Sequence, residues 1–272
     1  MVKKISVFCL KLVITLILFY LIFTKIKFDD VVAEIHKLQF QDLSLLLFVM
    51  FVQLLIASAR WHKILHILQI ALTYKECLTY NWVGMFFSQA LPSSIGGDAY
   101  KILQIKGLGC SYKSAFSSVI NDRIFGLLGL LTIILTFPFI ALAMGQKQVL
   151  EFDITKIMIV SMSIFFLFFC LPKTINFLRK IVRLRELLNF IEEFFLVKNS
   201  SVTVLFLITS SICVHLITIV IFLLISSAMS LEISPIIFFI LVPIMVLITT
   251  LPISIAGWGV REGFFVFSLG HF

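Results

Sequence analysis

Long uncharged apolar runs separated by short polar segments dominate this chain. The clearest runs occupy residues 5–24, 41–59, 120–144, 155–172 and 202–229. A helix needs about 20 residues to cross a hydrocarbon core of about 30 Å, and it satisfies its own backbone polar groups there. The pattern therefore predicts an all-α, polytopic integral membrane protein.

Two further apolar stretches, residues 78–97 and 233–260, contain irregular motifs. The sequences are LPSSIGGDAYK at 91–101 and LPISIAGWGVR at 251–261. Both have Leu-Pro, then Ser-Ile, then Gly, with a basic residue ten positions after the Leu. Proline removes a helix donor, and glycine allows unusual backbone conformations and close approach. We therefore expect a broken helix in each stretch.

The distribution of Lys and Arg decides the topology of the first stretch. If 78–97 crosses the membrane fully, the basic loop 173–198 lies outside, and seven loop and tail cations lie inside against twelve outside. If it dips in and returns, fourteen lie inside and five outside. Because cytoplasmic loops carry the excess of Lys and Arg, the second arrangement is favoured, with a cytoplasmic N-terminus and 78–97 re-entrant.

An odd number of spans separates the two motifs, so the second stretch should open to the opposite face. Interrupted hydrophobic segments in corresponding positions of inverted halves are typical of a transporter's midplane binding site. We expect a single membrane domain over 1–272, with about 6–8 membrane segments and pseudo-repeats at about 1–115 and 120–272. Residues 233–260 are also long enough to cross completely, which would leave the second motif at the cytoplasmic end.

The two motifs supply groups that bind a lipid headgroup. Exposed N–H groups at a helix break form an anion site, serine hydroxyls add donors, and Lys101 and Arg261 suit a phosphate. Asp98 and Glu262 would pair with these cations or accept a headgroup amine. The candidate substrate-binding residues of the motifs are Pro92, Ser93, Ser94, Gly96, Gly97, Asp98, Lys101, Pro252, Ser254, Gly257, Gly259, Arg261, Glu262 and Gly263. The alternative is an interfacial loop whose two basic side chains reach lipid phosphates.

Other polar residues allow more than one interpretation. Asp122 and Arg123 are adjacent, so they point in different directions on a helix, either as boundary anchors or lining a cavity. His215, inside an uncharged span, is typical of a helix–helix hydrogen bond more than of a proton relay. Arg60 and Trp61 resemble an interfacial anchor pair.

Two amphipathic segments, 61–72 and the basic 174–195, are typical of helices at the membrane surface, with partner binding as the alternative. Near the N-terminus, Lys3 and Lys4 precede an apolar stretch as in a signal peptide. No small-residue cleavage site follows it, so we expect a retained first membrane helix.

Composition agrees with a membrane protein: 61% of residues are hydrophobic, 13% are charged, and the net charge is +8. The positive charge fits cytoplasmic loops and anionic lipids, and no basic segment is long enough for a nucleic-acid module. The five cysteines lack metal or disulfide spacing. We expect no cofactor, no metal and no catalytic residues, because no catalytic motif occurs and no soluble stretch is long. An intramembrane enzyme stays an alternative.

Residues LPSSIGGDAYKI at 91–102, NDRIFGLLGLL at 121–131 and LPISIAGWGVREG at 251–263 resemble the lysylphosphatidylglycerol synthase transmembrane region, or flippase-like domain family. RWHKIL at 60–65 fits the same family, and the similarity covers nearly the whole chain. The resemblance implies that Asp122 and Arg123 belong to the candidate site together with the motif residues.

In that family the membrane domain is similar to a flippase, and a separate soluble domain makes the lipid. The resemblance therefore implies a lipid transporter and not aminoacyl transfer. Members usually continue with more helix after the second motif, so here either the last helix is short or the chain is truncated.

We expect a plasma-membrane flippase-like protein that moves a phospholipid or lipid-linked intermediate with an anionic or zwitterionic headgroup. The alternatives are a non-transporting scaffold that recruits a separate synthase through 174–195, and an aminoacyl- or glycosyl-lipid transferase subunit.

Overall fold

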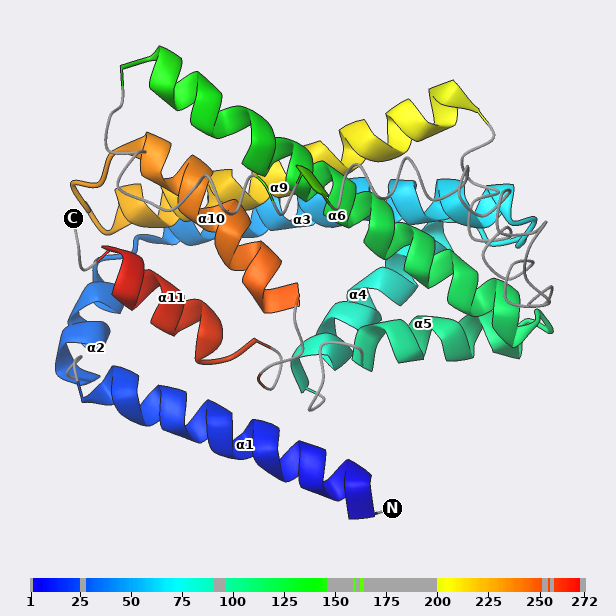
Figure 1. Cartoon of the computed structure of the whole chain (residues 1–272), viewed down its shortest axis with the longest axis horizontal. Coiled ribbons are helices and arrows are strands. Elements are labelled where there is room, and N and C mark those ends of the chain that lie inside the picture. Colours follow the sequence, from blue (N-terminus) through cyan, green and yellow to red (C-terminus); the bar gives the residue numbers. More distant parts are fainter. Residues whose placement is uncertain are drawn as a thin grey trace. The chain divides into compact units, whose positions relative to one another are not determined.

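The fold comes from a computed structural model, which describes residues 2–24, 28–90, 96–145, 159, 162–163, 200–250, 254 and 257–269. These residues form helices, turns and short connections, without strands (Figure 1). The helices are α1 (Val2–Phe23), α2 (Phe28–His36), α3 (Phe40–Ile67), α4 (Tyr74–Ala90), α5 (Gly96–Gly107), α6 (Tyr112–Ala143), α9 (Ser201–Ala228), α10 (Pro235–Thr250) and α11 (Val260–Leu269).

Three of these helices, α3, α6 and α9, are long and apolar enough to cross a membrane. With 28 residues, α3 is about 42 Å long and exceeds the hydrocarbon thickness. Half of the apolar window of α6 is buried within the protein, against 11% for α3 and 17% for α9. The exposed sides of α3 and α9 therefore suit contact with lipid, whereas α6 is the most buried of the three. The expected multi-pass, all-α membrane protein is confirmed.

The helix boundaries differ from the sequence expectation in one important place. The segment predicted as a separate surface helix, 61–72, is largely a continuation of α3, which ends only at Ile67. A turn with Gln69 at φ 57° follows. Trp61, Ile64 and Leu65 are completely buried, so the prediction of a membrane-surface helix was wrong. The predicted span 155–172 lies almost entirely, and the basic segment 174–195 completely, outside the described residues.

The chain forms two compact units, each made of segments that are distant in sequence. Unit 1 contains residues 1–53, 82–100 and 216–272, and unit 2 contains residues 54–81 and 101–215. This division differs from the predicted pseudo-repeats, which stay a prediction.

Helices α4 and α5 form an antiparallel hairpin (Figure 1). Near its tip the rings of Phe87 and Tyr100 stack with centroids 5.2 Å apart. At its open end Cys77 of α4 and Ile105 of α5 belong to one buried cluster. Helix α5 thus packs back on α4, as expected for a stretch that a break divides into two helices, and the predicted position of the break at Leu91 lies outside the described residues.

Gly97 makes the close packing at the hairpin tip possible. A Cβ at this position would overlap the backbone oxygen of Gly84 and the Oγ of Ser88. A backbone atom cannot move aside as a flexible side chain can. We therefore expect Gly97→Ala to destabilise the protein by about 1–3 kcal/mol, the usual cost of overpacking.

Thermal unfolding of the detergent-solubilised protein measures this effect. Gly107→Ala, on the same helix, is the matched control, because a Cβ there meets nothing within 4 Å. Equal melting temperatures for the two variants would contradict the close approach of α4 and α5.

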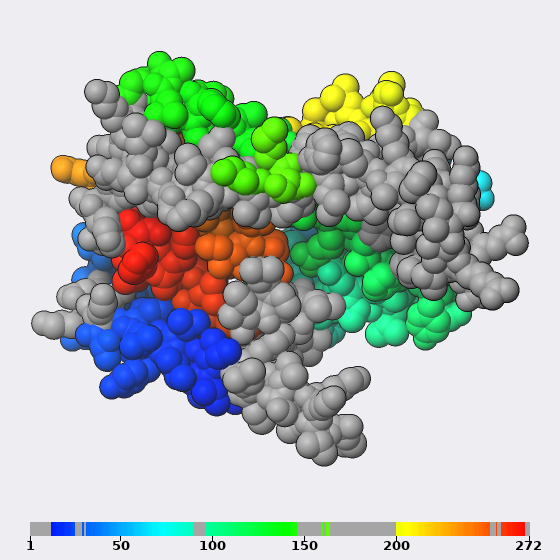
Figure 2. Space-filling model, viewed as in Figure 1, coloured from blue at the N-terminus to red at the C-terminus, as the bar shows by residue number. Residues whose placement is uncertain are grey.

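Helices α10 and α11 form a second hairpin within unit 1, and α1 packs against α11. In Figure 2 the surface of α11 lies against those of α1 and α10. The turn before α11 contains Gly257 and Gly259 at φ 79° and 81°, a conformation that favours glycine. A Cβ on Gly259 would lie 2.7 Å from the Cβ of Leu18, so α1 packs directly on this turn.

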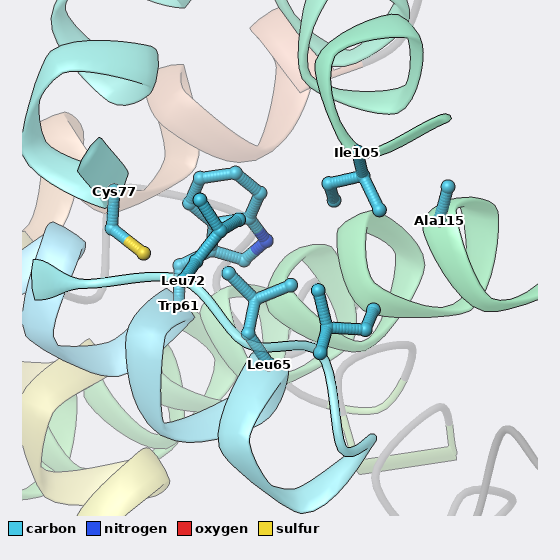
Figure 3. Close-up of a cluster of buried hydrophobic side chains, with 7 residues drawn as sticks. Trp61, Leu65, Leu72, Cys77, Ile105 and Ala115 are labelled. Carbon is cyan, nitrogen blue, oxygen red and sulfur yellow. The ribbon is translucent and has the colours of Figure 1, made fainter. Parts of the chain in front are cut away.

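The core of unit 2 is built around Trp61. Its ring lies among side chains from α3, the following turn, α4, α5 and α6 (Figure 3). Elsewhere in this unit α6 and α9 approach closely, because a Cβ on Gly129 would lie 2.8 Å from the backbone carbonyl carbon of Ser211. Unit 2 therefore holds its helices together by both apolar packing and backbone proximity.

Candidate functional site

The second motif forms a capped helix start that positions Arg261. The Oε2 of Glu262 accepts a hydrogen bond from the backbone N–H of Gly259 at 2.7 Å. This is one half of a capping box, in which the third helical residue reaches back to the N-cap N–H; the N-cap is a glycine and has no side chain to return a bond. The Oε1 of Glu262 accepts from Nε and Nη2 of Arg261, at 3.2 and 3.1 Å. Glu262 therefore fixes both the helix start and the guanidinium.

Arg261 lines a cavity of about 240 Å³ within unit 1. Its polar lining also includes Gln89, Thr218 and Thr249, from α4, α9 and α10. The apolar lining consists of Phe222, Met245 and Val246, and the backbone of Gly257 completes the wall. A guanidinium, an amide and hydroxyl groups thus meet beside apolar side chains, as in ligand-binding cavities.

The tips of the two hairpins meet at this cavity. The indole Nε1 of Trp258 donates a hydrogen bond to the Oε1 of Gln89 at 3.3 Å. Gln89 lies two residues before Leu91, and Trp258 lies inside the second motif. Trp258 also packs on Phe19 of α1, with ring centroids 6.0 Å apart. The structure therefore brings together the ends of two stretches that are far apart in sequence.

The predicted residues of the first motif are described only in part. Gly96 and Gly97 are buried at the start of α5, and Asp98 is half-buried in its first turn. Pro92, Ser93, Ser94 and Pro252 lie outside the described residues. In the second motif, Ser254 is 3% exposed, and its hydroxyl has no hydrogen-bond partner among the residues that the structure describes. A Cβ on Gly263 would meet nothing within 4 Å.

Lys101 belongs to unit 2, whereas the cavity belongs to unit 1. Its Nζ lies 4.6 Å from the centroid of the Trp61 ring, a cation–π contact. It is also close enough to Asp122 for its charge to act on that carboxylate. The structure therefore places Lys101 beside buried groups of unit 2.

Asp122 forms a buried ion pair in unit 2. Its Oδ1 accepts a hydrogen bond from Nε of Arg60 at 2.8 Å, and Nη1 of Arg60 donates to the Oγ of Ser211 at 2.9 Å. The two charged side chains are only 9% and 14% exposed. Arg60 and Trp61 are both buried, so their predicted role as an interfacial anchor was wrong.

The neighbours of Asp122 agree with their predicted geometry. Arg123 is exposed, so the two adjacent residues do point in different directions. The Nε2 of His215 lies 3.0 Å from the backbone oxygen of Gly126, which joins α9 to α6. The predicted helix–helix hydrogen bond of His215 is thereby confirmed.

Comparison with family models found the lysylphosphatidylglycerol synthase TM region, matched over residues 8–272. The chain belongs to this family. Comparison with curated proteins found no match, and comparison with solved structures found none either. Membership of the lysylphosphatidylglycerol synthase TM region family confirms the resemblance carried by the two motifs and by NDRIFGLLGLL.

The sequence analysis did not identify several residues that the structure places at the candidate site. Gln89 and Trp258 join the hairpin tips, and Thr218 and Thr249 line the cavity. Gln89 lies two residues before the first motif, so its position in the sequence could have identified it as a candidate. A threonine within an apolar span gives none, because threonines there commonly bond back to their own helix, as Thr249 does to Val246.

Proposed function

We propose that the chain moves a phospholipid or a lipid-linked intermediate between the leaflets of the plasma membrane. The headgroup passes through the cavity where the hairpin tips meet, while the acyl tails stay in the bilayer. The observation that carries this proposal is the position of Arg261 in a cavity lined by polar groups from three other helices.

The energetic cost of placing an ionisable residue such as Arg261 in a membrane protein's interior supports a role in transport. Ionisable residues at membrane depth are expensive and usually mark the path of a substrate or ion. Arg261 is 40% exposed in its side chain and lines a cavity, so it is available to a ligand. A guanidinium suits a lipid phosphate because it offers several donors in a planar fork.

The two hairpins support access from both faces of the membrane. In the topology favoured by the positive-inside rule, the N-terminus is cytoplasmic and α4–α5 re-enters from the cytoplasm. The α10–α11 hairpin then enters from the opposite side. Short broken helices whose tips meet at a polar site are typical of transporters with inverted repeats.

The membership of the chain in a membrane-domain family linked with flippase-like function also supports transport. In this proposal the chain moves a lipid and does not make one. Glu262 positions Arg261, the glycines at 257 and 259 let the backbone line the path, and Asp98 tunes the charge at the first tip.

A leaflet assay on reconstituted vesicles tests the proposed function. We expect fluorescent-tailed phosphatidylglycerol to become accessible to an external quencher faster in vesicles with the protein than in protein-free vesicles. A panel of anionic and zwitterionic lipids that all move at the protein-free rate would contradict the proposal.

A further inference from the structure

A second cavity, which we call the end cavity, lies in unit 1 where α3 begins and α9 ends (Figure 1). Its volume is about 280 Å³. Its polar lining consists of Lys37, Gln39, Asp42, Ser227 and Ser230, and its apolar lining consists of Leu45, Leu224 and Ala228. None of these residues lines the cavity of Arg261. The end cavity is therefore a separate polar site to which the proposed function gives no role.

The end cavity lies at the level of the lipid headgroups. Both α3 and α9 are long and apolar enough to cross a membrane, and the cavity is formed by the first turns of one and the last turn of the other. Each helix has 28 residues and is about 42 Å long, so its ends extend beyond a hydrocarbon core of about 30 Å. The charges of Lys37 and Asp42 are thereby placed where lipid phosphates and amines lie.

The end cavity offers a cation beside a carboxylate. The Nζ of Lys37 forms an exposed salt bridge with the Oε1 of Glu34, and an ammonium has further N–H groups to donate to a ligand. The Oδ2 of Asp42 accepts a hydrogen bond from the backbone N–H of Gln39 at 3.0 Å, which leaves Oδ1 for a ligand. A headgroup that carries only a negative charge would meet the carboxylates unfavourably, whereas an added amine would bind to one.

Two helix ends with opposite partial charges also meet at the end cavity. The N-terminus of α3 carries partial positive charge, which adds to that of Lys37. The C-terminus of α9 carries partial negative charge, and the exposed Glu232 follows it closely. The hydroxyl groups of Ser227 and Ser230 can donate or accept. The arrangement matches a ligand with separate negative and positive ends.

Apolar side chains continue from the end cavity along α3. Leu45 lines the cavity and is 46% exposed, and Phe48, three residues further on the same face, is 63% exposed. Only 11% of the apolar window of α3 is buried within the protein. Acyl chains attached to a headgroup in the end cavity can therefore lie along this surface, which favours a lipid over a soluble compound with the same polar groups.

We propose that the end cavity binds a phospholipid with a zwitterionic phosphoethanolamine headgroup. Lys37 and the start of α3 bind the phosphate, while Asp42 and the end of α9 bind the ammonium. The acyl chains lie along Leu45. This inference goes beyond the proposed function, because it assigns a lipid-binding site that does not require transport through the cavity of Arg261.

Native mass spectrometry of the full chain in detergent measures the binding directly. Dioleoyl phosphatidylethanolamine, phosphatidylcholine and phosphatidylglycerol are titrated under equal conditions. We expect phosphatidylethanolamine to bind at least about fivefold more tightly than the other two, the usual effect of a hydrogen bond. Phosphatidylcholine keeps the positive charge without an N–H to donate, and phosphatidylglycerol has no positive charge. Equal affinities for the three lipids would overturn the proposal.

An Asp42→Asn variant links the preference to the end cavity. Asparagine can still accept the hydrogen bond from the N–H of Gln39, so the helix start is kept while the negative charge is lost. We expect phosphatidylethanolamine to bind about five- to tenfold more weakly and its preference to disappear. Asp29→Asn is the matched control, because Asp29 is exposed on α2 and does not line the cavity. A preference that persists in Asp42→Asn would overturn the proposal.

A Lys37→Gln variant tests the phosphate half of the site. It should weaken phosphatidylethanolamine binding about three- to tenfold, because the phosphate loses its cation. Wild-type affinity in this variant would remove Lys37 from the site and overturn the assigned position of the phosphate.

Two further measurements identify the source of the headgroup and separate the two cavities. Glycerophosphoethanolamine has the same headgroup without acyl chains and should not displace the lipid, and its displacement of the lipid would overturn the assignment to a lipid. Arg261→Ala should bind phosphatidylethanolamine as the wild type does, because Arg261 lines the other cavity. Loss of binding in Arg261→Ala would overturn this inference. Intact binding without leaflet exchange would contradict the proposed function alone.

Discussion

An Arg60→Met variant is expected to unfold at a markedly lower temperature than the wild type. Arg60 and Asp122 form a buried ion pair at 2.8 Å, and Ser211 accepts a second hydrogen bond from the same guanidinium. Removal of one partner of a buried pair typically costs about 3–5 kcal/mol, and here it leaves Asp122 without its hydrogen-bonded cation, with only the more distant charges of Lys101 and Arg123 near it. Thermal unfolding in detergent, followed by circular dichroism, measures the loss.

Two further variants separate the ion pair from a general effect of substitution. Arg123→Met changes an exposed neighbour of Asp122 and should alter stability by no more than about 0.5 kcal/mol. The double variant Arg60→Met/Asp122→Leu removes both charges and should regain a large part of the lost stability. A double variant that is less stable than Arg60→Met alone would show that the pair does not account for the loss.

An Arg261→Ala variant is expected to lose most of its lipid movement while it keeps its fold. A hydrogen bond to a charged group contributes about 1.5–3 kcal/mol, which corresponds to a rate lower by about 10- to 150-fold. Arg261 lines the cavity, and its salt bridge with Glu262 is 34–40% exposed, so a large loss of stability is not expected. Leaflet exchange of phosphatidylglycerol, with unfolding temperature measured in parallel, checks both parts.

Arg261→Lys serves as the control for charge without the planar fork. It keeps a cation but loses the second donor on the same plane, so its rate should lie between those of wild type and Arg261→Ala. Wild-type rates in the alanine variant would remove Arg261 from the path of the headgroup.

The helix breaks were predictable from sequence because proline and glycine act locally. One Leu-Pro pair lies between α4 and α5 and the other between α10 and α11, and within each of these two pairs the helices pack on one another. Gly257 and Gly259 do adopt the left-handed backbone conformation, which favours glycine over other residues. Local backbone chemistry therefore predicted both hairpin tips.

The partners of polar residues were not predictable in the same way. Arg60 and Asp122 are 62 positions apart, and Gln89 and Trp258 are 169 apart. Nothing local specifies such pairs. The amphipathic pattern of 61–72 led to a wrong prediction for a related reason. A helix that packs its apolar face on protein and one that packs it on lipid show the same periodicity of apolar residues. Only the packing of Trp61 against α4, α5 and α6 distinguishes them.

Chemical blockage of the cavity tests the central claim most directly. In a background whose five native cysteines are replaced by alanine, Thr249→Cys places a thiol in the cavity wall, and Thr250→Cys places one on the outside of the same helix. Lipid movement is measured before and after labelling with a bulky, charged methanethiosulfonate. We expect labelling to stop movement in the Thr249→Cys protein and to leave it unchanged in the Thr250→Cys protein. Full-rate movement after complete labelling of Thr249→Cys would contradict passage of the headgroup through this cavity.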